Sequence, residues 1–147
     1  MSAADLHDRL GEAIGMTQAL RVVVRHLSAQ LEPEIGLAQL LVRLNSDIEE
    51  MQRRCDSLVA SHTEIKQSRI TATAREVKAR VAAQPPATLP PSELLSVLVV
   101  AAKDVVAKWR ALEALMSYRH DPPVTSLVRA AILVHTDHVH ELARHAS

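Results

Sequence analysis

The chain has 147 residues with 17 basic and 17 acidic side chains, so it has no net charge when its eight histidines are neutral. It contains no Phe, one Trp, one Tyr, one Cys and three Gly, a composition that favours helices and argues against a β-sandwich or barrel. The balanced charge gives no field that would attract nucleic acid or an anionic membrane, and one cysteine excludes a disulfide within this sequence.

The amino-terminal residues lack the basic and apolar segments of a signal peptide. The longest strongly apolar run, residues 94–102, is far shorter than the ~20 residues that cross a bilayer. A lone cysteine also suits a reducing compartment. The sequence therefore predicts a cytoplasmic protein with no membrane segment.

The first predicted helix covers residues 3–31. Its apolar residues recur at alternating spacings of three and four, which places them on one face and forms a seam that another helix must cover. Pro33 and Gly36 mark the turn that follows. This seam consists of Leu6, Leu10, Ala13, Thr17, Leu20, Val24, Leu27 and Leu31.

The second predicted helix is unusually long, covering residues 34–83, because no Pro or Gly occurs between Leu37 and Gln84. After Ile65 the apolar residues change phase. Two alternatives explain this change: a continuous helix whose apolar face rotates toward another helix, which we favour, or a break within 67–73, where weak helix formers gather. The seam of this helix contains Leu37, Leu41, Leu44, Ile48, Met51, Cys55, Leu58, His62 and Ile65.

Four prolines in residues 84–91 indicate an extended linker, placed at 85–91. The third predicted helix covers 92–118 and begins with a segment that is apolar nearly all round, LLSVLVVAA. This composition predicts burial on several sides, against both the second and the fourth helices. The prolines after Asp121 end the third helix, and the fourth covers 124–145.

These elements together predict an all-α fold: an up-down bundle of about four helices with coiled-coil character. Residues 1–84 would form a long helical hairpin. After the linker, residues 92–147 would form a second hairpin, packed on the first as one domain.

The histidines near the carboxyl terminus are the one cluster that suggests chemistry. His135 and His138, at i, i+3 spacing, would be able to ligate a metal ion together with Glu141 or a residue from another helix. The candidate ligand set of this alternative is His135, His138, Glu141 and His145. The Glu-x-x-His pairs of di-iron bundles do not occur in the chain. The competing interpretation is a solvated helix with one packed histidine, so no metal or cofactor site is predicted.

Three other features have simple structural interpretations. Cys55 and His62 share a seam but lie ~10 Å apart along a helix, too far for a nucleophile and its base, so Cys55 is interpreted as a buried apolar residue. The basic stretch 66–80 lacks aromatic stacking residues and is interpreted as a solvated face rather than a nucleic-acid surface. Gly11 and Gly15 have the spacing of a close helix contact, a weak signal outside a membrane.

The sequence therefore predicts a non-enzymatic interaction protein, a scaffold or adaptor subunit that acts through coiled-coil helix packing. Its partner would be a helical protein or a second copy. The alternative is a metal-binding bundle that uses the carboxyl-terminal histidines. The predicted partner surface comprises Leu37, Leu41, Leu44, Ile48, Met51 and Leu58 of the second helix with Leu20, Val24 and Leu27 of the first.

Overall fold

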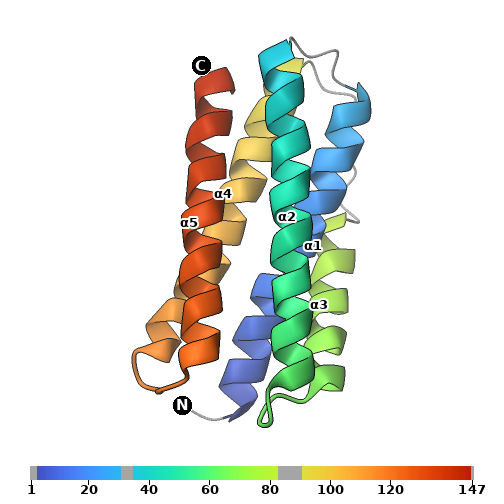
Figure 1. The fold of residues 1–147 in the computed structure, drawn as a ribbon. Coiled ribbons are helices and arrows are strands. Elements are labelled where there is room, and N and C mark those ends of the chain that lie inside the picture. Colours follow the sequence, from blue (N-terminus) through green and yellow to red (C-terminus); the bar gives the residue numbers. More distant parts are fainter. Residues whose placement is uncertain (1–2, 31–34, 83–90, 147) are drawn as a thin grey trace.

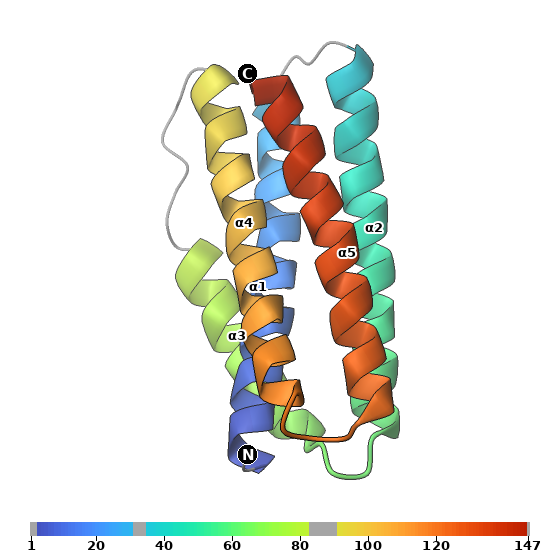
Figure 2. The same cartoon turned by 90° about the vertical axis from the view of Figure 1, so that its left-hand side faces the viewer.

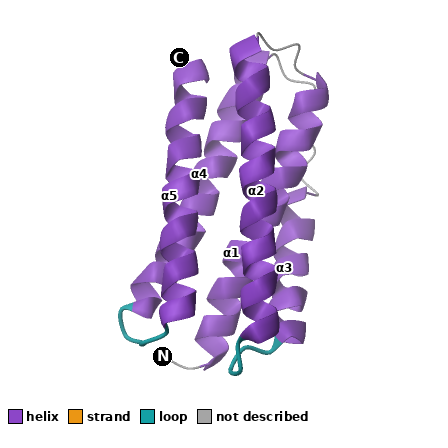
Figure 3. Cartoon of the chain, in the orientation of Figure 1, coloured by secondary structure: helices purple, strands orange, loops and turns teal. Residues whose placement is uncertain are grey.

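The computed structural model describes residues 3–30, 35–82 and 91–146, and every regular element in these ranges is a helix (Figures 1 and 3). The helices are α1 (Ala3–Gln30), α2 (Ile35–Ser61), α3 (Gln67–Ala82), α4 (Pro91–Met116) and α5 (Pro122–Ala146). The predictions of an all-helical chain and of a helical bundle are confirmed. The predicted linker lies, apart from Pro91, outside the described residues.

The start of α5 follows from local chemistry. Proline has no N–H to lose in the first turn of a helix, and α5 accordingly begins at Pro122. Asp121 precedes it and accepts a hydrogen bond on its carbonyl from the Thr125 N–H at 2.9 Å. Its carboxylate accepts a longer one from the Val124 N–H at 3.4 Å. The Asp121 carbonyl thus accepts the first i→i−4 bond of the helix, and its carboxylate caps the Val124 N–H, which the first turn leaves without a helical partner.

The prediction of a continuous second helix over 34–83 is wrong. Residues 62–66 form a loop between α2 and α3, and the stretch 67–73, where a break was the alternative, is helical. In this loop the Lys66 N–H donates to Nε2 of the buried His7, 2.8 Å away on α1. The side chain of Ile65 is buried beside it. Contacts to distant parts of the chain, rather than a proline or glycine, therefore end α2.

The helices pack around α1, which contacts α2, α3 and α4, while α5 completes the bundle against α2 and α4 (Figures 1 and 2). The helix α3 lies against the lower part of α1 and barely contacts α2. The prediction that the third predicted helix, now α4, packs on the second is wrong. In the described ranges α4 contacts α1 and α5 instead.

The contact between α1 and α3 depends on two glycines. A Cβ atom on Gly15 would lie 2.6 Å from the Ala74 carbonyl oxygen, and one on Gly11 would lie 2.7 Å from the Thr73 Cβ. Both distances are shorter than van der Waals contact, so only glycine allows α3 to approach this closely. The small-residue spacing, interpreted from sequence as a weak signal, marks a real close approach.

The core is almost entirely aliphatic, and Thr17 and Trp109 form a buried polar contact within it. The Thr17 hydroxyl donates to the Ala13 carbonyl at 2.8 Å and accepts from Nε1 of Trp109 at 3.0 Å. This pair joins α1 to α4 at the centre of the bundle. None of the described helices combines the length and the apolar character that a membrane span requires.

Candidate functional site

Most of the residues predicted as a partner surface lie inside the bundle. Leu58 is half-buried and packs against the core, and the side chain of Leu27 lies outside the described residues. The structure thus places the predicted seams against the chain's own helices. The buried members are Leu20, Val24, Leu37, Leu41, Leu44, Ile48 and Met51.

His62 joins two loops at one end of the bundle. Its Nδ1 accepts a hydrogen bond from the Glu64 N–H at 3.1 Å, so this nitrogen has no proton. Nε2 therefore carries the ring proton and donates it to the Asp121 carboxylate at 2.6 Å. Arg119 forms ion pairs with both Asp121 and Glu64. With both ring nitrogens occupied, His62 holds the loops together and is not available as a general base.

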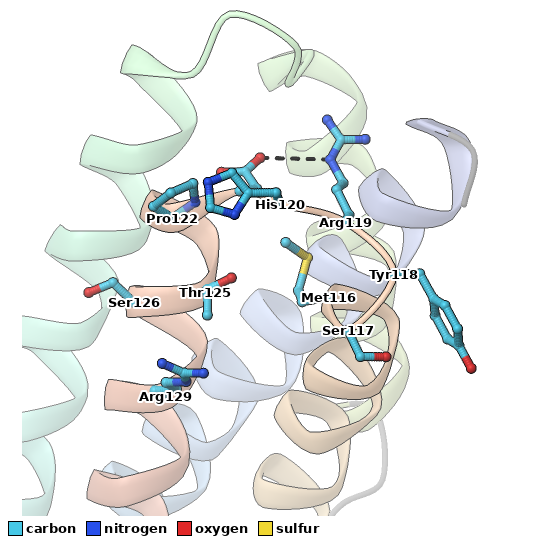
Figure 4. A pocket seen from close by; sticks show the side chains of 10 residues that line it. Met116, Ser117, Tyr118, Arg119, His120, Pro122, Thr125, Ser126 and Arg129 are labelled. Carbon is cyan, nitrogen blue, oxygen red and sulfur yellow. Dashed lines mark ion pairs between the residues drawn. The ribbon is translucent and has the colours of Figure 1, made fainter.

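Two adjoining surface clefts, of about 810 and 630 Å³, flank this loop contact. Figure 4 shows the larger one, where the Arg119 side chain is directed at Asp121 rather than at the hydroxyl of Thr125 or Ser126. Arg129 lines the same cleft from α5. The cleft therefore offers isolated polar groups, and its described residues do not form a nucleophile–base pair.

The strongest electrostatic anomaly is a pair of buried histidines on α5. His135 and His138 are fully buried, with ring centroids 5.5 Å apart in an edge-to-face arrangement. His138 contacts the Asp47 carboxylate through Nε2 at 2.8 Å. Neither nitrogen of His135 has a hydrogen-bond partner among the described residues, nor does Nδ1 of His138. Burial, with a smaller contribution from His138, lowers the pKa of His135 to about 3, so the ring is neutral in the folded chain.

The alternative metal ligands are not brought together as a set of four. Only His135 and His138 share the interior, while Glu141 forms ion pairs with Arg43 and Arg144. His145 lies near Gly36, at the end of the bundle where α2 begins. No group of three or more His, Cys, Asp or Glu side chains in the described chain is arranged to hold a metal ion.

Cys55 is buried, as predicted, with 1 % of its surface exposed. Burial, reinforced by the negative charge of Asp56, raises the pKa of its thiol to about 12. The thiol is therefore protonated and inaccessible at neutral pH, and His62 contacts Asp121 rather than Cys55. A thiolate nucleophile at this position is incompatible with that environment.

Sequence reasoning missed a second apolar face on α4. Alongside its buried face, α4 exposes Val97 (37 %) and Val100 (57 %), two of the few large apolar side chains that are exposed in the described chain. The positions that follow at alternating spacings of three and four are also exposed. We call this set the outer stripe: Val97, Val100, Asp104, Ala107, Ala111 and Ala114.

The outer stripe borders a groove of about 540 Å³ between α1 and α4. Val97, Val100, Asp104 and Ala107 contribute to one wall, and the other wall is largely apolar. The signal for this surface was present in the segment LLSVLVVAA, whose apolar character was interpreted as burial alone. The α1 wall consists of Met16, Ala19, Leu20 and Val23.

Comparisons with known proteins do not assign the chain to a family. The sequence matches no protein-family model, and neither a curated protein nor a solved structure is detectably similar to it.

Proposed function

We propose that this chain is a non-enzymatic interaction or scaffold subunit that binds another helix by coiled-coil packing on α4. One observation carries the proposal: α4 has an inner apolar face buried in its own bundle and an outer stripe at heptad spacing that its own bundle leaves exposed. Contiguous exposed apolar surface is typical of interaction sites.

The polar clusters support a structural role rather than a catalytic one. His62 uses both nitrogens to hold two loops together. The thiol of Cys55 is buried and protonated. The outer stripe instead offers what helix association needs, since the apolar surface that its valines still expose contributes roughly 25 cal/mol per Å² when another helix buries it.

Site-specific photocrosslinking in cells tests the proposal. A photoreactive residue at position 100 should give a discrete protein adduct, whereas the same residue at position 133 should not. Leu133 is the matched control because it is 75 % exposed on α5, with exposed polar neighbours at 129 and 137 rather than an apolar stripe. Equal crosslinking at both positions, or none at position 100, would contradict the proposal.

A further inference from the structure

We infer that the helix that docks on the outer stripe is α4 of a second copy of this chain, running antiparallel to the first. This inference rests on the proposed function and specifies its partner. Three properties of the outer stripe support it: the order of its large and small side chains, the position of its one carboxylate, and its accessibility along α4.

The order of side-chain sizes favours an antiparallel pair. The stripe has its two valines toward the start of α4 and its three alanines toward the end. In an antiparallel pair with the two-fold axis between positions 104 and 107, Val100 faces Ala111 of the second copy, and Val97 faces Ala114 of the second copy. Each layer then combines a larger residue with a smaller one, which lets two helices pack closely without voids.

A parallel pair lacks this fit. Each residue would face its own counterpart, so valine would meet valine at one end and alanine would meet alanine at the other. The two Asp104 carboxylates would also face each other within one layer, where like charges are unfavourable, whereas the antiparallel pair separates them by one layer, about 4.5 Å along the helix axis. The stripe therefore selects the antiparallel orientation.

The charges around the stripe complement Asp104 in the antiparallel pair. Asp104 would face Ala107 of the second copy, and three basic residues lie within four positions of that alanine: Lys103, Lys108 and Arg110. Lys103 and Arg110 are exposed, and neither forms an ion pair within the described residues. Lys108 is 3.7 Å from Glu12 of α1, which adds a second carboxylate beside the stripe. In the antiparallel pair, the Asp104 carboxylate of each copy thus lies near basic side chains of the other copy.

Every residue of the outer stripe is exposed on α4. From Val97 to Ala114 the stripe extends about 26 Å at ~1.5 Å per residue. One helix pair of that length buries less than the ~800 Å² per partner of a standard interface, so the dimer should dissociate on dilution. The expected behaviour is a monomer–dimer equilibrium rather than a permanent dimer.

Sedimentation equilibrium over roughly a hundred-fold range of concentration tests the inference. The wild-type mass should rise from 16.1 kDa toward twice that value. Val100→Glu should remain monomeric with unchanged helicity and melting temperature, and Asp104→Asn should dimerise at least several-fold more weakly. Leu133→Glu, the exposed control, should dimerise like the wild type. A wild type that is monomeric throughout, or a Val100→Glu variant that dimerises normally, would overturn the inference.

Disulfide trapping tests the orientation separately. In a mixture of Val100→Cys and Ala111→Cys copies, oxidation should form the 100–111 bond in preference to the 100–100 bond, because only the antiparallel pair brings positions 100 and 111 together. Preferential 100–100 bonding would overturn the antiparallel pair. If position 100 crosslinks in cells to a different protein while the purified chain stays monomeric, the inference that the partner is a second copy is refuted, and the proposed function stands.

Discussion

Replacing His135 by leucine should stabilise the folded chain, most strongly in mild acid. The imidazole is fully buried with neither nitrogen hydrogen-bonded within the described residues. A buried polar group without a partner costs about 1–3 kcal/mol. Leucine has a similar volume and no polar atom, so His135→Leu should recover part of that cost near neutral pH.

The pH dependence provides the sharper test. The pKa of His135 is lowered to about 3 in the fold, against an ordinary histidine value of 6.5. The unfolded chain therefore takes up this proton below pH 6.5 while the folded chain does not, so stability is complete above 6.5 and is lost as pH falls toward 3. Near pH 4.5, about two units below the unfolded value, the loss from this one group reaches roughly 2.7 kcal/mol.

The charged groups around the pair do not change the sign of this effect. On α2, Asp47 contacts His138 rather than His135, and Arg43 forms ion pairs with Asp137 and Glu141 of α5. The buried residues of α4 and of the nearby part of α1 are apolar, apart from the hydroxyl of Thr17. No described carboxylate therefore contacts His135 to stabilise its charged form.

Urea titrations at several pH values, followed by the fluorescence of the buried Trp109, measure the effect. The stability gap between His135→Leu and the wild type should widen as pH falls below 6.5. His140→Leu is the control, since His140 is exposed on the same helix. A gap that stays constant between neutral and mildly acidic pH would refute the argument.

Three further predictions follow from buried contacts. Gly15→Ala should lower stability by about 1–3 kcal/mol in urea titrations, because the new Cβ meets backbone atoms of α3. Gly36→Ala is the control: the nearest neighbour of its new Cβ would be 3.7 Å away, so this change should raise stability slightly. Thr17→Val removes the acceptor of the Trp109 N–H and should cost about 1–3 kcal/mol, with Thr17→Ser losing less, by the same titration. Cys55 should resist thiol reagents until urea unfolds the chain, and rapid labelling of the native chain would contradict this burial. Because burial raises the pKa of the Cys55 thiol to about 12 in the fold, the stability of the chain should also fall as pH rises above 9.

Much of the helical content was predictable because its signals are local. Proline placement and heptad spacing give the bounds of α1, α4 and α5 to within two residues. The phase change after Ile65 also appears in the sequence. It reflects a separate helix, α3, that packs its apolar residues on α1, whereas α2 packs against both α1 and α5.

The break at 62–66 was not predictable, because its causes lie far away in the chain. His62 and Asp121 are 59 positions apart, as are His7 and Lys66. Neither pair leaves a local signature, and no proline or glycine occurs there. The buried His135–His138 pair was only partly visible: spacing placed both histidines near the apolar face of α5, but not the partner of His138 on α2.

The break also decides where a partner can bind. A continuous second helix would extend beyond α1 and present its seam to another protein. Because the chain reverses at 62–66, α3 instead packs along α1, and the described seam residues lie against their own bundle. A heptad pattern shows which face of a helix is apolar, but not which helix covers it. On α4, flanked by α1 and α5, the inner face is covered by the described helices while the outer stripe is exposed, which is why we propose the outer stripe as the place where another helix binds.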